Sequence, residues 1–201
     1  MAAATPPSAT RVSVRIGPRS DIKSPAGLHI LAEGGTEGAQ AMTDQRHTLV
    51  AWLRHAHAME RATVDTLDHL AERLRRPYPD LAARFRQHWE ESLGQVERIE
   101  TCLKELASDT STFQDLRNRF IGIAQAYAVE VLPDELVRDC MAVYASRHFE
   151  IATYLSLGAA ARKFKQPSIA QMCEENLQQE RAMASWLEQQ IPEATLEFLR
   201  S

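Results

Sequence analysis

The sequence has few of the residues that would place it in several large classes of protein. Its three cysteines are far apart and match neither a disulfide framework nor a paired-cysteine metal site, so we expect buried, reduced thiols in a cytoplasmic protein. No stretch approaches the roughly 18 uninterrupted apolar residues of a membrane span, so no membrane partner is expected. The formal net charge of −4 gives no positive field for a polyanion, so nucleic acid is not expected as the main partner.

Aromatic residues are missing from the first part of the chain. Residues 1–43 contain no Phe, Trp or Tyr, but they hold five of the eight glycines and four of the nine prolines. Because such a composition cannot bury an apolar core, we expect a disordered leader over residues 1–43 and one folded domain over residues 44–201. The leader lacks the apolar run of a secretory signal, and its early basic residues leave a transit peptide or a basic tether as the alternative.

From residue 44 onwards, apolar residues recur every three or four positions with hardly any alternation of period two. This pattern predicts helices throughout. Prolines and capping residues divide it into four long helices, which run from Asp44 to about Pro77, from Pro79 to about Ser108, from Asp134 to Phe164, and from Ser168 to a last helical turn after Pro192.

A shorter helix is expected between the second and third long helices, from Thr112 to about Val131. Two tight turns and this longer connection describe an all-α, ferritin-like four-helix bundle with a helical crossover between helices two and three. A simple up-down bundle and a dimeric coiled coil are the alternatives. The breaks at Pro77, Pro133 and Pro167 disfavour a single long rod.

Three acidic residues lie in the middle of predicted apolar stripes. The neighbours of Glu60, Glu150 and Glu180 at three- and four-residue spacing are mostly apolar, small or aromatic. An ionised carboxylate in such an interior is costly unless a cation or hydrogen bonds offset the loss of water. A shared cation would explain all three, whereas the plainer interpretation exposes each acid or pairs it with an arginine.

The second predicted helix supplies further polar groups. His88 and Glu91 are three residues apart, and Glu91 and Gln95 are four apart, so all three share a face. Carboxylates with imidazole beside them bind two hard metal ions in the centres of di-iron and di-manganese bundles. A single histidine of this kind is more often a surface or core residue than a ligand.

Several segments together are similar to one known family. They are residues 58–61, 88–99, 147–154 and 174–180, and with them the chain resembles the YciE/YciF family of ferritin-like bacterial proteins over nearly all of residues 46–190. The most specific parts are Gly-Gln-Val-Glu-Arg-Ile in the second helix and His-Phe-Glu-Ile-Ala-Thr-Tyr in the third. The resemblance implies a ferritin-like bundle, a homodimer, a dinuclear iron or manganese site and a stress-linked role.

The resemblance also implies which residues would form that metal site. The family's acids correspond to Glu60, Glu91, Glu150 and Glu180, and the polar positions beside them correspond to His88, Gln95 and His148.

Four positions depart from the family's pattern. The family usually has acids where this chain has Arg147, Gln179, Ala184 and His55, and the chain has no Glu-x-x-His pair. Fewer negative ligands weaken the binding of hard divalent cations. Arg147 can instead replace the metal as the counter-ion of Glu150.

Two functions therefore stand as alternatives, and the sequence does not decide whether the protein is an enzyme. One is a stress-associated protein whose carboxylates bridge two iron or manganese ions that react with oxygen or peroxide. The other is a non-enzymatic helical stress or interaction protein with a degenerate, metal-free centre.

Overall fold

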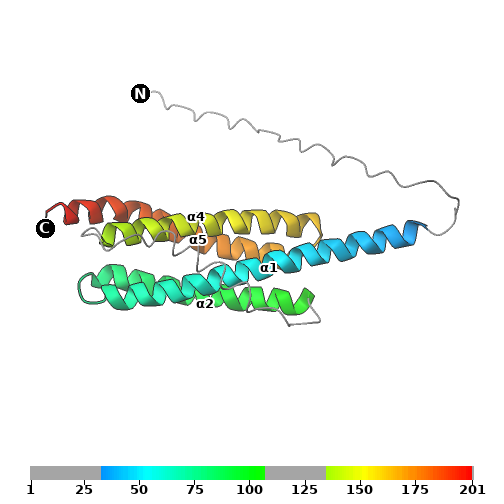
Figure 1. Ribbon diagram of the computed structural model, residues 1–201, viewed down its shortest axis with the longest axis horizontal. Helices are drawn as coiled ribbons and strands as arrows, with labels where there is room; N and C mark the ends of the chain where they lie inside the picture. The colour runs from blue at the N-terminus through cyan, green and yellow to red at the C-terminus, as the bar shows by residue number, and fades with distance from the viewer. Residues whose placement is uncertain (1–32, 107–134, 201) are drawn as a thin grey trace, which may run out of the picture.

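The computed structural model describes residues 33–106 and 135–200, and every regular element within these ranges is an α-helix (Figure 1). The helices are α1 (Glu33–Leu74), α2 (Pro79–Leu106), α4 (Glu135–Lys163) and α5 (Pro167–Phe198). The prediction of an all-α, ferritin-like bundle is confirmed. None of the described helices is long and apolar enough to cross a membrane.

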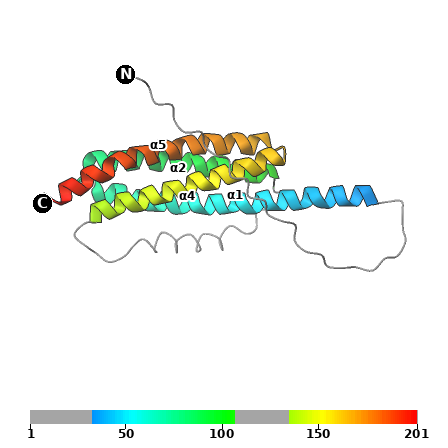
Figure 2. The ribbon, with the colours of Figure 1, turned by 90° about the horizontal axis from the view of Figure 1, so that it is seen from above.

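Two helix boundaries differ from the predicted ones. Helix α1 begins at Glu33, so residues 33–43, expected in the leader, are helical, and this part of α1 projects beyond the ends of the other helices (Figures 1 and 2). Helix α5 continues through Pro192 to Phe198 instead of breaking there. Ala194, beyond the proline, is buried, so the helix still packs on the bundle past the position where Pro192 cannot donate a hydrogen bond. The predicted leader over residues 1–32 and the predicted helix over residues 112–131 lie outside the described residues.

The four helices form two hairpins. Helix α1 packs most extensively on α2, and α4 packs most extensively on α5. Tight turns at residues 75–78 and 164–166 connect the helices of each pair. The hairpins then lie against each other, with α1 beside α4 and α2 beside α5 (Figure 1). Each tight turn leaves its two helices antiparallel, so the middles of α2, α4 and α5 lie level with residues 60–63 of α1.

The core is divided along its length into three parts. One apolar cluster includes Leu53, Ile99 and Leu157, and the other includes Phe85 and Met183. Between them lies a buried polar layer, to which every helix contributes: Glu60, Thr63, His88, Ser92, Gln95, Arg147, Glu150 and Glu180. Polar residues therefore interrupt the apolar stripe of each helix at the same level along the bundle axis.

The three cysteines belong to the apolar parts of the core. Cys102, Cys140 and Cys173 are buried and free, as the sequence predicts. Burial raises the pKa of the Cys102 and Cys140 thiols to about 11 and that of Cys173 to about 12. These thiols are therefore protonated at neutral pH and act as small apolar groups.

Truncation of a core leucine measures how much the apolar clusters stabilise the bundle. Leu53 is fully buried, so we expect Leu53→Ala to lower the free energy of unfolding by about 2–5 kcal/mol, through lost contacts and the cavity left behind. Urea denaturation at neutral pH measures this. Leu196 is 52% exposed, and Leu196→Ala should cost less than about 1 kcal/mol. Equal losses in the two variants would contradict this description of the core.

Candidate metal centre

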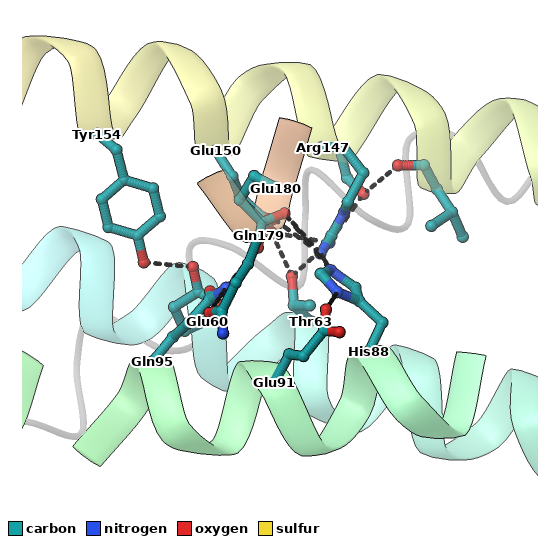
Figure 3. Close-up of polar contacts among 12 residues, drawn as sticks. Glu60, Thr63, His88, Glu91, Gln95, Arg147, Glu150, Tyr154, Gln179 and Glu180 are labelled. Atoms are coloured by element: carbon teal, nitrogen blue, oxygen red, sulfur yellow. Dashed lines mark hydrogen bonds and ion pairs between the residues drawn. The ribbon is translucent and has the colours of Figure 1, made fainter. Parts of the chain in front are cut away.

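Three carboxyl groups from three helices meet in the polar layer. Glu60 of α1, Glu150 of α4 and Glu180 of α5 each place a carboxylate oxygen within 4.8 Å of the other two (Figure 3). All three side chains are buried. At this separation the charges of the three groups are strongly coupled, so the cluster requires positive charge, protons or both.

The positive charge is supplied by Arg147, which is itself buried. Its Nη2 donates a hydrogen bond to Glu150 Oε1 at 2.9 Å, and its Nη1 donates to Glu180 Oε2 at 3.0 Å. Nη1 also lies 2.9 Å from Glu150 Oε2, and Nη2 donates to Thr63 Oγ1 at 3.0 Å. The guanidinium thus lies among the acids as their counter-ion, the role that the sequence assigned to it as an alternative to metal.

His88 is fixed from both sides. Its Nε2 lies 2.6 Å from Arg147 Nη1, and its Nδ1 lies 2.6 Å from Glu91 Oε2. Because a guanidinium can only donate, Nε2 must accept this bond, so Nδ1 carries the hydrogen and donates it to Glu91. The imidazole lone pair that a metal would use is therefore bonded to Arg147.

Glutamine and tyrosine side chains complete the other side of the cluster. Gln95 Nε2 donates to Glu180 Oε1 at 2.7 Å and to Gln179 Oε1 at 3.1 Å. Tyr154 donates to Glu60 Oε1 at 2.5 Å. Within the described residues, four oxygens of the polar layer are buried without a hydrogen-bond partner: Glu60 Oε2, Gln95 Oε1, Glu150 Oε2 and the Ser92 hydroxyl. The layer therefore has spare acceptors.

The acids differ in how strongly they hold a proton. Burial raises the pKa of Glu60 to about 8, and the nearby Glu180 carboxylate adds to this increase. Burial also raises the pKa of Glu150, although Arg147 opposes it. Burial acts on Glu180 in the same direction, but Arg147 and hydrogen bonds outweigh it and lower the pKa of Glu180. At neutral pH the cluster therefore contains an ionised Glu180, Arg147 and a protonated Glu60.

The remaining predicted site residues lie at different distances from the cluster. Glu91 is partly exposed and reaches the centre only through His88, and the hydrogen bond from His88 together with the nearby Arg84 guanidinium lowers its pKa against the effect of burial. Gln95 lies in the cluster, as described above. His148 is exposed on the outer side of α4 against the ring of Tyr144, because two residues turn a helix by roughly 200° from Glu150. The structure therefore gives His148 no contact with the acids.

The donor set does not fit two metal ions. Arg147 already donates hydrogen bonds to Glu150 Oε1, Glu180 Oε2 and the His88 nitrogen, and a second ion would lie against its positive charge. The three oxygens without a hydrogen-bond partner, Glu60 Oε2, Gln95 Oε1 and Glu150 Oε2, supply ligands for one cation at most. A dinuclear centre would require Arg147 to leave the cluster.

Residues 44–200 match the model of a family described as a domain of unknown function, DUF892. The chain belongs to this family. A solved structure from Xanthomonas campestris pv. campestris is 32% identical, with a TM-score of 0.58, and the match covers 78% of this chain and 97% of that chain. Together with the YciF structure described next, this match confirms the resemblance to the YciE/YciF family.

Two further solved structures share the fold of this DUF892 chain. The Escherichia coli stress protein YciF is 20% identical with a TM-score of 0.64, over 75% of this chain and 96% of that chain. YcfI, a putative structural protein from Rhodopseudomonas palustris, is 24% identical with a TM-score of 0.61, over 72% of this chain and 92% of that chain.

Removal of Arg147 tests its role as the counter-ion. Arg147→Met leaves Glu150 and Glu180 buried without a cation, so we expect the free energy of unfolding to fall by about 3–5 kcal/mol. Urea denaturation at neutral pH measures this loss. The exposed Arg181 of α5 provides the control, and Arg181→Met should be nearly neutral. If Arg147→Met were equally neutral, the guanidinium would not stabilise the cluster.

The proton on Glu60 makes stability depend on pH. The pKa of Glu60 in the folded protein, about 8, lies above the ordinary glutamate value of 4.5 that applies to the unfolded chain. Its contribution is therefore complete below about pH 4.5 and is lost as the pH rises to about 8. We expect the stability of wild type relative to Glu60→Gln, from urea denaturation across this window, to fall with rising pH. A constant difference would mean that Glu60 is ionised throughout.

Proposed function

We propose that this chain is a non-enzymatic helical protein of a bacterial stress response, in which Arg147 and retained protons neutralise the central acids in place of metal ions. The observation that carries the proposal is the buried Arg147 guanidinium, within 3.0 Å of both Glu150 and Glu180. The descriptions of two proteins with the same fold, a stress protein and a putative structural protein, agree with this role.

The bonding of the cluster supports a structural role over an oxidative one. Metal centres that react with oxygen or peroxide need several ligands and open coordination positions. Here Arg147 donates to Glu150, Glu180 and His88, Gln95 donates to the other oxygen of Glu180, and Tyr154 donates to one oxygen of Glu60. These hydrogen bonds join all four helices, so the layer links the two hairpins across the middle of the bundle.

A single divalent cation is the second candidate, and the unpartnered oxygens of Glu60 and Gln95 favour it. Such an ion would displace the proton of Glu60 and would be held by the cluster of Glu60, Glu150 and Glu180. Bound there, it would supply positive charge. An iron or manganese pair that reacts with oxygen is a weaker candidate, because Arg147 occupies the side of the cluster where the second ion would need its ligands.

Metal content and thermal stability distinguish these candidates. We expect protein purified without chelator to contain no stoichiometric iron or manganese, and its melting temperature to be unchanged by EDTA or by added Mn²⁺. Binding of a cation to the native state would raise the melting temperature by mass action. About one ion per chain that disappears in Glu60→Ala would support the single-cation candidate, and about two ions would support the dinuclear one.

Restoring the missing acid offers a gain-of-function test. Arg147→Glu removes the counter-ion and adds a carboxylate, so we expect this variant to bind Mn²⁺ or Fe²⁺ and to be stabilised by it. Isothermal titration and melting curves with and without metal measure both effects. Arg181→Glu adds the same charge on the exposed side of α5 and should bind none. Equal binding by wild type and Arg147→Glu would count against the role given to Arg147.

The homodimer that the resemblance implies remains a prediction, as does a cytoplasmic location. Light scattering on the purified chain checks the first.

A further inference from the structure

The most specific stretch of the sequence is only partly explained by the polar layer. Residues 94–99 read Gly-Gln-Val-Glu-Arg-Ile, and Gln95 is the member that reaches the layer, through its bond to Glu180. The valine and the isoleucine of this stretch are buried in the apolar core. Gly94 and Arg98 are left without a role.

Arg98 of α2 reaches across to α5. Its Nε donates a hydrogen bond to Asn176 Oδ1, and its Nη2 donates to Gln179 Oε1, each at 2.7 Å. The Glu175 carboxylate is farther away, 4.0 Å from Nε. An arginine whose role was only to pair with an acid would turn to that carboxylate, because charge-assisted bonds between ions are the stronger ones. Arg98 instead directs its two short bonds to neutral amide oxygens.

These bonds decide which way the two amide groups face. The oxygen and the nitrogen of an amide side chain differ as acceptor and donor, so their partners determine which end points where. A guanidinium can only donate, so Arg98 requires the oxygens of Asn176 and Gln179 to face it. The nitrogen of Asn176 is thereby left to donate to Met172 Sδ, at 3.4 Å, inside the core.

The orientation of Gln179 in turn sets that of Gln95 (Figure 3). Gln179 Oε1 accepts a second hydrogen bond from Gln95 Nε2 at 3.1 Å, and Gln95 Nε2 also donates to Glu180 Oε1 at 2.7 Å. Both hydrogens of the Gln95 amide are therefore used. If Gln179 turned over, its NH₂ group would face the NH₂ group of Gln95, with two donors and no acceptor between them. Only the orientation that Arg98 selects allows both bonds.

Gly94 gives the guanidinium room to lie in this position. A methyl group at residue 94 would lie 3.4 Å from Arg98 Nη1, so the guanidinium lies back along α2, over the turn that precedes it. Glycine is among the least favourable residues inside a helix, and Gly94 lies in the middle of α2. The glycine and the arginine of this stretch are therefore parts of one arrangement.

We propose that Arg98 is a positioning residue of the polar layer, which holds Gln179 by its oxygen and through Gln179 fixes the direction of the buried Gln95 amide. The Arg98 side chain is 31% exposed, whereas Gln95 is completely buried, so a side chain at the surface controls a group in the centre. The hydrogen bonds of Arg98 reach the layer through amides and not through the central acids. This role therefore holds whether the layer contains metal or not.

Solvent exchange of the Gln95 side-chain amide hydrogens tests this role in the full chain. NMR of isotope-labelled protein measures their rate, and Gln95→Met identifies the signal. In wild type we expect exchange at least about a hundredfold slower than at the exposed Gln178. Arg98→Met removes the donors but keeps an apolar side chain, and it should speed the exchange of Gln95 at least about tenfold. Arg181→Met, at an exposed position of α5, should leave the rate unchanged.

A double variant shows whether Arg98 acts through Gln179. Gln179→Met already removes the carbonyl that links Arg98 to Gln95, so adding Arg98→Met to it should change the Gln95 rate by less than about twofold. Arg98→Lys brings a single nitrogen in place of two and should give a rate between those of wild type and Arg98→Met.

Three results would overturn the proposal. The first is an unchanged Gln95 rate in Arg98→Met. The second is an equal acceleration of the backbone amide of Met183, in the other apolar cluster, which would mean that Arg98→Met only lowers global stability. The third is a double variant in which the two effects multiply, because Arg98 would then act on Gln95 by another route. Should Arg98→Met fail to fold, Arg98→Lys and Gln179→Met give the same comparison with the charge retained.

Discussion

The buried ion pairing of Arg147 with Glu150 and Glu180 is the interaction on which the centre of this bundle depends. Isolated charges are almost never stable in a protein interior, so each member of the cluster needs the others. Arg147 holds two acids and the His88 imidazole, and through His88 it reaches Glu91. One side chain therefore organises groups from α2, α4 and α5, and its bond to Thr63 adds α1.

In a carboxylate bundle, a guanidinium and a metal ion are alternative solutions to one electrostatic problem. Both bring positive charge to converging acids, but a guanidinium is tied to the chain, donates in one plane and cannot accept ligands. A guanidinium at the centre therefore supplies charge but, unlike a metal ion, offers no coordination position for a small molecule. The fold of a family can thus be kept while the chemistry at its centre changes.

The sequence predicts the fold well because the helical signals are long and repeated. Apolar spacing and the breaks at Pro77 and Pro167 locate the helices, and the convergence of Glu60, Glu150 and Glu180 follows from their position in the apolar stripes. Local signals fail where tertiary packing decides, as at Pro192. Positions beside an acid in the sequence are also poor guides, because His148 lies on the other side of α4. Thr63 and Tyr154 join the cluster because they lie three and four residues from Glu60 and Glu150, a spacing that identifies them only once those acids are known to be central.

The placement of the polar layer between two apolar clusters also controls how the hairpins fit together. Apolar stripes repeat with every helical turn, about 5.4 Å, so their periodicity alone does not fix how far one hairpin is shifted along the other. A slip of this size would move Arg147 against the leucines of one cluster and strand Glu60 from Tyr154. The charged layer therefore favours one axial register between the two hairpins.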